Sequence, residues 1–227
     1  MRNSLPLSQG ANGSARFANR AVKRAMDLLG AGVGLVVTAP LFVVVGLLIR
    51  REDRGPVFYT PNRVGKDGRP FRMFKFRTMV VDADRIGGPS TAGDDPRLTR
   101  VGARIRRYKL DELPQLFNVV RGEMSLVGPR PEVQHYVDMY SPAEREILSV
   151  KPGITDWASI RYRNEAEILR GAADPEQAYM ERIRPGKIAL GLEYVHRQSI
   201  WVDLSLIVQT IAALFAREPA VDAGGNG

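Results

Sequence analysis

The sequence contains no cysteine and only two histidines among its 227 residues. The absence of cysteine excludes disulfide bonds, thiolate metal sites and cysteine nucleophiles. His135 and His196 are 61 positions apart and form no recognised metal-binding motif, so a histidine-rich zinc site is excluded as well. Lysine and arginine outnumber aspartate and glutamate by 33 to 25, which gives a net charge of +8. Such a surplus favours an anionic partner, whether nucleic acid, anionic lipid or a phosphorylated substrate.

Charge is also missing from residues 28–49, which read LLGAGVGLVVTAPLFVVVGLLI. An uncharged apolar run of 22 residues is typical of a membrane-embedded segment. Both flanks of this run are basic: Arg16, Arg20, Lys23 and Arg24 precede it, and Arg50, Arg51, Arg54, Arg63 and Lys66 follow it. Because positive flanks prefer the cytoplasmic side, both ends of the segment are expected on that side.

Pro40 lies near the middle of the run, where proline breaks or kinks a helix. The arms 28–39 and 41–49 would be about 18 and 14 Å long, and neither crosses an apolar core of about 30 Å. We therefore predict that residues 20–50 form a re-entrant helix-hairpin broken at Pro40, with Thr38 donating to a carbonyl freed near Val36. A kinked single-pass helix is the alternative that these residues leave open.

A second apolar segment, residues 200–216, contains Asp203 and is a poor spanning helix. Its polar residues fall near one helical face, which predicts an interfacial amphipathic helix over residues 197–217, with Trp201 at headgroup depth. An ordinary core helix is the alternative. Residues 1–19, a basic tail, and residues 218–227 are expected to be disordered.

Residues 51–196 remain as a cytosolic catalytic domain. Asp67-Gly68 lies between β-prone runs and predicts a small β-hairpin. Ser141 to Glu144 forms a capping box, which predicts the start of a helix, and Asp174-Pro175 predicts the start of another. The predicted fold class is therefore α+β and mostly helical, with a compact helical body between the two apolar segments.

The residues best suited to chemistry are Asp111 and Glu112, which are adjacent and surrounded by cations. Such surroundings favour ionised carboxylates. An ionised aspartate can attack phosphorus, and a neighbouring glutamate can help to hold Mg²⁺. Gly128-Pro129-Arg130-Pro131-Glu132 forms a stiff turn that holds Arg130 for bidentate phosphate contact. Taken alone, each feature also fits a surface or turn role.

Four blocks in this order carry a resemblance: KRAMDLLGAGVGLVVTAPLF (23–42), the stretch from Gly55 to Met79, LDELPQLFNVVRGEMSLVGPRPE (110–132) and KPGIT (151–155). The chain resembles the bacterial sugar transferases, that is, the monotopic polyprenyl-phosphate phosphoglycosyl transferases. The resemblance covers residues 20–215.

The resemblance implies transfer of a sugar 1-phosphate from a UDP-sugar to undecaprenyl phosphate, with release of UMP. It implies Asp111 as the nucleophile, Glu112 as its partner and Mg²⁺ as the cofactor, held by both. It implies the bacterial inner membrane as the location, with the active site and both termini on the cytoplasmic face. The positively charged residues matched to, or expected at, the phosphates are Lys75, Arg77, Arg106, Arg130 and Arg163.

The chain departs from the family pattern at Tyr108-Lys109, at Asp156 and in residues 157–164, which places the sugar and base contacts in question more than the reaction. One rival function is a membrane-tethered nucleic-acid-binding module, with Phe71, Phe74 and Phe76 as stacking groups. The others are a lipid-linked transferase of a different phosphoryl donor and a scaffold for polysaccharide assembly. We expect no nucleic acid as partner; homo-oligomer formation stays open.

Overall fold

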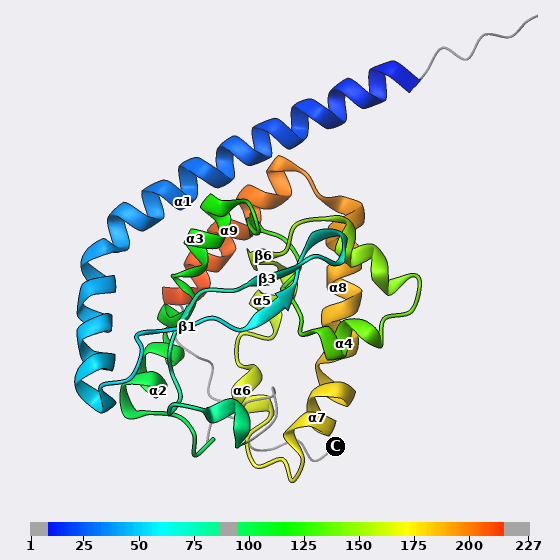
Figure 1. The fold of residues 1–227 in the computed structure, drawn as a ribbon. Helices are drawn as coiled ribbons and strands as arrows, with labels where there is room; N and C mark the ends of the chain where they lie inside the picture. The colour runs from blue at the N-terminus through cyan, green and yellow to red at the C-terminus, as the bar shows by residue number, and fades with distance from the viewer. Residues whose placement is uncertain (1–8, 87–94, 216–227) are drawn as a thin grey trace, which may run out of the picture.

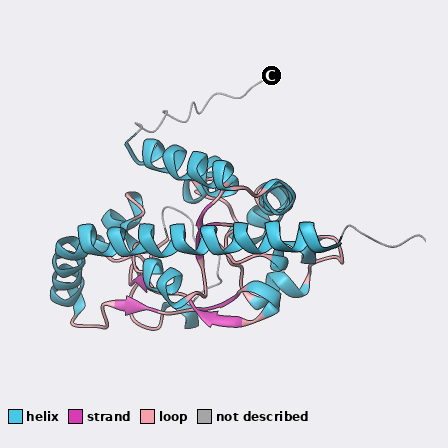
Figure 2. Ribbon diagram, turned by 90° about the horizontal axis from the view of Figure 1, so that it is seen from above, coloured by secondary structure: helices cyan, strands magenta, loops and turns pink. Residues whose placement is uncertain are grey.

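The computed structural model describes residues 9–86 and 95–215 of the chain. Of the two predicted tails, residues 1–8 of the first and all of residues 218–227 lie outside this range. One long helix, α1, runs across a body of short helices and small strand pairs (Figures 1 and 2). The prediction of a mostly helical α+β fold is confirmed.

Helix α1 (Gln9–Asp53) begins well before the anchor predicted to start at residue 20. Residues 9–19, which we expected to belong to a disordered tail, are helical. Alanine and arginine recur in residues 15–25 (ARFANRAVKRA), and both are good helix formers, which favours a helix that extends backward from the apolar run.

Pro40 lies inside α1, which stays helical on both sides of it. Figure 1 shows α1 as two arms that run in clearly different directions, with the bend in the apolar segment. Thr38 donates to the carbonyl of Gly34 at 2.6 Å, so the expected hydroxyl bond forms, but not to Val36. The predicted hairpin is thus not confirmed in the form of two helices joined by a reversal; the segment is one bent helix.

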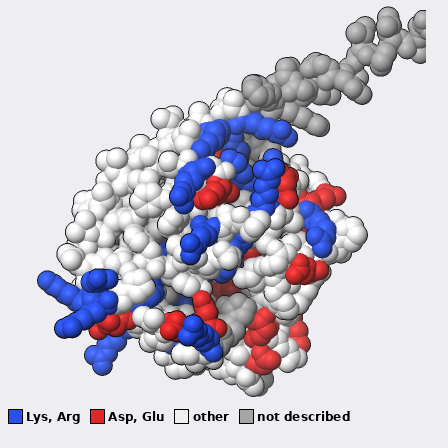
Figure 3. Space-filling model, viewed as in Figure 1, with Lys and Arg blue, Asp and Glu red and all other residues white. Residues whose placement is uncertain are grey.

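The surface of α1 is apolar and open. Val36 and Val37 are 77% and 71% exposed, and Leu29 and Val33 are similarly uncovered. Figure 3 shows this uncharged surface, with basic side chains gathered near its two ends. Residues 20–53 are long and apolar enough to cross a membrane, by length and composition alone. A helix of the soluble core would instead bury these side chains.

The body follows from Phe58 onward. Its strands are β1 (Phe58–Tyr59), β2 (Asn62–Val64), β3 (Pro70–Arg72), β4 (Lys75–Phe76), β5 (Ser125–Val127) and β6 (Gly153–Thr155). Its helices are α2 (Arg100–Arg107), α3 (Gln115–Arg121), α4 (Gln134–Asp138), α5 (Trp157–Arg161), α6 (Glu165–Ile168), α7 (Pro175–Arg182), α8 (Arg184–Arg197) and α9 (Ile200–Phe215). β1 pairs with β4 and β2 with β3, both antiparallel, whereas β5 and β6 are parallel.

The predicted β-hairpin is confirmed as β2–β3, with Asp67 and Gly68 at the turn. Both residues have positive φ, 57° and 74°, which Asp and Gly tolerate better than other residues. The capping predictions also hold. Ser141 and Glu144 exchange backbone-to-side-chain bonds before a short 3₁₀ helix, and Asp174 accepts from two amides at the start of α7.

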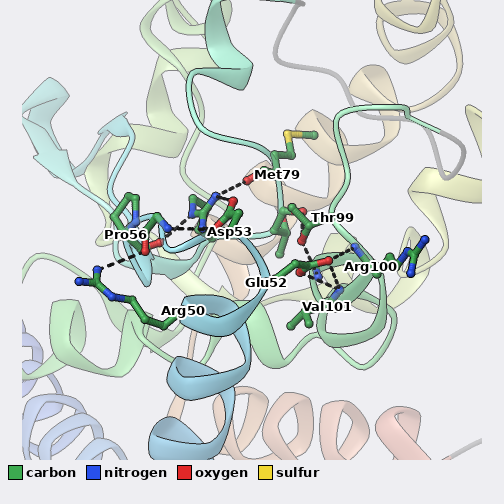
Figure 4. A network of polar contacts seen from close by, with 12 residues as sticks. Arg50, Glu52, Asp53, Pro56, Met79, Thr99, Arg100 and Val101 are labelled. Atoms are coloured by element: carbon green, nitrogen blue, oxygen red, sulfur yellow. Dashed lines mark hydrogen bonds and ion pairs between the residues drawn. The ribbon is translucent and has the colours of Figure 1, made fainter.

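The end of α1 is tied to the body by two adjacent acids (Figure 4). Glu52 accepts from the backbone amides of Arg100 and Val101 at 2.8 and 3.1 Å, so it caps the N-terminus of α2. Asp53 accepts hydrogen bonds from both terminal nitrogens of Arg77, which is buried. This joint, Glu52 and Asp53 with their partners, connects the second arm of α1 directly to α2 and to the chain just after β4.

Helix α9 packs one mixed face against the body. Asp203 is 1% exposed and pairs with Lys23 of α1 at 2.5 Å, and Tyr194 of α8 donates to the same carboxylate at 2.8 Å. Leu206 on the same face is fully buried beside Tyr194 and Val127. Trp201 and Val208 on the other side are 81% and 65% exposed, so α9 is a surface helix that leaves large apolar side chains uncovered.

Candidate active site

Asp111 and Glu112 lie in a short 3₁₀ helix, Leu110–Glu112, between α2 and α3. Lys109 adopts a left-handed conformation, φ 56°, which turns the chain out of α2 and into this helix. Gly102 sets the position of α2, because a Cβ there would lie 1.9 Å from the carbonyl oxygen of Thr78. Close packing of α2 against the chain after β4 thus brings the two carboxylates beside Lys75.

Arg130 is held by more than its two neighbouring prolines. The amide of Gly153 donates to the carbonyl of Pro129 at 3.0 Å, and the amide of Val64 donates to that of Glu132 at 2.9 Å. The turn is therefore bonded on one side to the start of β6 and on the other to β2. This confirms that Arg130 is fixed in place, and backbone pairing adds to the stiffness expected from proline.

Glu112 is the centre of a partly buried ion cluster. Arg130 donates to both of its oxygens, Nη1 to Oε2 at 3.1 Å and Nη2 to Oε1 at 2.5 Å. Lys75 Nζ contacts Oε1 at 3.2 Å. Three predicted site residues, from β4, the 3₁₀ helix and the turn after β5, are thereby brought together with Asp111, which directly precedes Glu112.

The two carboxylates have opposite electrostatic surroundings. Burial raises the pKa of Asp111, and the charges of Lys75 and Arg106 only partly oppose this rise. Burial also acts on Glu112, but the charges of Arg130 and Lys75 outweigh it and hold the pKa of Glu112 well below its usual range. The expectation of a strongly ionised carboxylate therefore holds for Glu112, whereas for Asp111 the shift has the opposite sign. Paired groups with diverging pKa values are typical of sites that carry out chemistry.

Gln115 is a residue that the sequence interpretation missed. It is fully buried, and within the described part of the chain both polar atoms of its amide lack a hydrogen-bond partner, as does Asp111 Oδ1. Buried polar atoms are nearly always paired in native proteins. The sequence does contain a hint of this position, because Gln115 follows Asp111 by four residues, a spacing that places two side chains on the same side of a helical segment.

The donor set fits Mg²⁺. Mg²⁺ in proteins is usually held by one or two carboxylates, with substrate phosphates and water completing the octahedron. Asp111 Oδ1 is a buried carboxylate oxygen without a partner, and Glu112 keeps lone pairs beyond those used by Arg130 and Lys75. Among residues 9–86 and 95–215 no group of three acidic or histidine side chains could bind a metal without substrate.

The other predicted site residues lie differently. Arg106, in the last turn of α2, is half-buried and acts on Asp111 through its charge. Arg77 lies in the joint at the end of α1, where Asp53 and the carbonyls of Pro56 and Met79 occupy its guanidinium. Arg163 is half-buried between α5 and α6, and no hydrogen bond or ion pair joins it to Asp111 or Glu112 in the described residues.

Comparison with known proteins gives a consistent match. The family described as bacterial sugar transferase matches residues 18–217, which is most of the chain. A UDP-N-acetylgalactosamine-undecaprenyl-phosphate N-acetylgalactosaminephosphotransferase of Aeromonas hydrophila is 38% identical over 85% of this chain and 43% of its own length. An undecaprenyl-phosphate glucose phosphotransferase of Komagataeibacter xylinus is 41% identical over 83% of this chain and 35% of its own.

A shorter relative matches along nearly its whole length. The exopolysaccharide production protein ExoY of Rhizobium meliloti is 35% identical over 89% of both chains. The chain thus spans less than half the length of the first two relatives but most of the third. Asp111 and Glu112 lie within the residues 18–217 that match the family.

Proposed function

Because the chain belongs to the bacterial sugar transferase family, we propose that it is a phosphoglycosyl transferase that moves a sugar 1-phosphate from a UDP-sugar to undecaprenyl phosphate. The named relatives act with different sugars, N-acetylgalactosamine in one and glucose in another, so the proposal stops at the UDP-sugar class. Transfer would take place at the cytoplasmic face of the bacterial inner membrane and begin a glycan pathway there.

One observation carries the proposal. Asp111 is buried with an unpartnered oxygen, and it lies next to a carboxylate whose charge is neutralised by Arg130 and Lys75. Both substrates are polyanions, so a nucleophilic carboxylate needs cations nearby to approach them. A surface acidic pair would have neither the burial nor the fixed arginine.

In the first step, an ionised oxygen of Asp111 attacks the phosphorus that bears the sugar. The bond from that phosphorus to the bridging oxygen breaks, and UMP leaves with the electron pair. The product is an acyl phosphate that joins Asp111 to the sugar phosphate. Arg130 and Lys75 are placed to stabilise negative charge on the phosphoryl oxygens as it shifts toward the leaving group.

In the second step, a phosphate oxygen of undecaprenyl phosphate attacks the same phosphorus. The bond to Asp111 breaks and the carboxylate is restored, so the lipid leaves as a diphosphate that carries the sugar. One phosphoanhydride replaces another, and the overall exchange needs no ATP.

Asp111 and Glu112 are the residues that would hold Mg²⁺. When bound, the ion would offset part of the charge on the diphosphate. Arg130 fixes the carboxylate of Glu112 through two hydrogen bonds, and Lys75 supplies a third contact. Burial of Asp111 limits the access of water that would otherwise hydrolyse an acyl phosphate.

The first half of the reaction gives a direct test. Purified protein incubated with a UDP-sugar and Mg²⁺, without lipid, should release UMP and gain the mass of one sugar phosphate in intact-protein mass spectrometry. Addition of undecaprenyl phosphate should discharge the adduct, and EDTA should prevent its formation. If UMP appears only when lipid is present and no adduct forms, the transfer is a direct displacement and the covalent step is wrong.

We further propose that α1 enters and leaves the same leaflet. The bend near Pro40, the apolar surface and the basic residues at both ends of the segment support this arrangement. A re-entrant helix keeps the active site at the height of the lipid phosphates, where the acceptor is. The alternative is a kinked helix that crosses the bilayer.

The chain has no cysteine, so single substitutions can report its topology without background. Arg20→Cys and Arg51→Cys place thiols at the two ends of the apolar segment, and Asp138→Cys marks the body. All three should react with a membrane-impermeant maleimide in inside-out vesicles and be protected in right-side-out vesicles. Opposite accessibility of positions 20 and 51 would establish a spanning helix instead.

A further inference from the structure

An apolar groove of about 610 Å³ lies between α1 and α9, which run side by side over the body (Figure 1). Its walls come from α1 and α9, and its floor comes from α3, β5 and β6. The groove is lined by Val22, Ala25, Met26, Leu29, Gly30, Leu116, Leu126, Ile154, Thr155, Ile207, Thr210 and Ile211. Its volume falls within the range of about 300–1,000 Å³ that is usual for ligand pockets.

The groove is suited to hydrocarbon rather than to water. Its two hydroxyl groups are already paired, because Thr210 donates to the carbonyl of Leu206 at 2.7 Å and is in turn bonded to Thr155 at 2.6 Å. The other lining side chains are apolar. A cavity without free polar partners holds water poorly and favours apolar occupants.

The groove opens onto apolar surface. Lys23 joins α1 to Asp203 of α9 and also donates to the carbonyl of Val127 at 3.1 Å, so the two helices that form its walls are tied together. Leu29 and Ile211 of the lining are 71% and 52% exposed. In a membrane, this opening would face the same hydrocarbon as the rest of the exposed α1 and α9 surface.

The floor of the groove is built on the elements that carry the active site. Leu116 is five residues after Asp111, and Leu126 is four residues before Arg130. Leu116 lies in the first turn of α3, which directly follows the 3₁₀ helix that holds Asp111 and Glu112, so the floor of the groove and the dyad are neighbours along the chain. A bulk phospholipid would not bind more tightly because of this proximity. A lipid whose phosphate reacts at Asp111 would, because its chain and its phosphate could be bound at the same time.

We propose that the groove binds part of the isoprenoid chain of the polyprenyl-phosphate acceptor. This inference rests on the proposed function, and it adds a binding site for the chain to the site for the phosphate. The groove then selects the acceptor by its chain, while Arg130 and Lys75 contact only the phosphate. Its occupant enters laterally from the leaflet through the open rim.

Photo-crosslinking tests the site without relying on turnover. A polyprenyl phosphate with a diazirine on its chain should label peptides that contain residues 22–30 and 207–211. An excess of undecaprenyl phosphate should remove this labelling, and an equal excess of phosphatidylglycerol should not. Labelling elsewhere, or equal competition by the phospholipid, would overturn the proposal and indicate an ordinary lipid-facing surface.

Kinetics of a filled groove provide the second measurement. Ala25→Trp places an indole in the groove, and Ala21→Trp makes the same change one helical turn away, outside the lining. Ala25→Trp should raise the KM for undecaprenyl phosphate by about 10-fold. The KM for the short acceptor farnesyl phosphate and the rate of adduct formation should stay unchanged. Ala21→Trp should alter none of them. Equal effects on both acceptors would contradict a chain site, whereas a wild-type protein that releases no UMP would contradict the proposed function itself.

Discussion

Asp111→Asn should reduce UMP release by about 10³-fold or more and eliminate the phosphosugar adduct. The amide has nearly the shape of the carboxylate but cannot act as the nucleophile that forms an acyl phosphate. The change also removes a buried group whose charge is costly, so folding should be kept or slightly improved. UMP release, intact mass and thermal unfolding should be measured on the same preparation.

Asp138→Asn is the matched control, because Asp138 is an exposed carboxylate whose bond is to Gln134 within its own helix. It should behave as wild type in all three measurements. Retained turnover in Asp111→Asn would exclude the nucleophile role. An inactive variant combined with a wild type that never forms the adduct would instead assign Asp111 to metal binding alone.

Arg130→Lys should lower kcat/KM by about 10²-fold although the charge is conserved. Lysine cannot make the two parallel bonds by which Arg130 holds both oxygens of Glu112, and it binds phosphate as a point charge rather than as a planar fork. The loss should appear in adduct formation as well as in full turnover, since the same cations serve both steps. Single-turnover UMP release is the measurement that separates chemistry from product release.

The control for this change is Arg170→Lys, because Arg170 makes an exposed bond to Glu167 within a single turn of chain. Its activity should stay within about twofold of wild type, as expected for an exposed pair. Wild-type kinetics in Arg130→Lys would show that the fork geometry is unimportant and that only charge is required. Circular dichroism should show that the body of Arg130→Lys stays folded, because Glu112 is still paired with Lys75.

The features that the sequence predicted correctly are mostly local. Asp67-Gly68, Ser141 with Glu144, and Asp174 each act within four residues, and the structure confirms all three. Backbone conformation and capping depend on near neighbours, so a single sequence contains the necessary information. The apolar run at residues 28–49 is similarly readable, although its bend angle depends on the surroundings.

The features that were missed join distant parts of the chain. Lys23 and Asp203 are 180 positions apart, and nothing in either local sequence indicates the other. Arg77 was expected at the phosphates, yet its buried guanidinium pairs with Asp53 at the end of α1. Charge alone cannot distinguish an arginine that binds substrate from one that joins two elements, because that difference is set by tertiary packing.

The candidate site was predicted in part from chemistry and in part from family resemblance. Glu112, Lys75 and Arg130 do come together, and their pairing explains why Glu112 is strongly ionised. The burial of Asp111, which raises its pKa, could not be read from its cationic neighbours in sequence. Desolvation depends on how α3 and β4 pack around the carboxylate, which only the fold determines.

The joint at Glu52 and Asp53 has a mechanical consequence. Glu52 bonds to the first amides of α2, and the same helix leads through Lys109 to Asp111. Glu52 and Asp53 therefore connect the end of α1 closely to the helix that leads to Asp111. A change in the tilt of the second arm of α1 would thus be transmitted to α2 and through it to Asp111, which makes the orientation of α1 a determinant of the site's geometry.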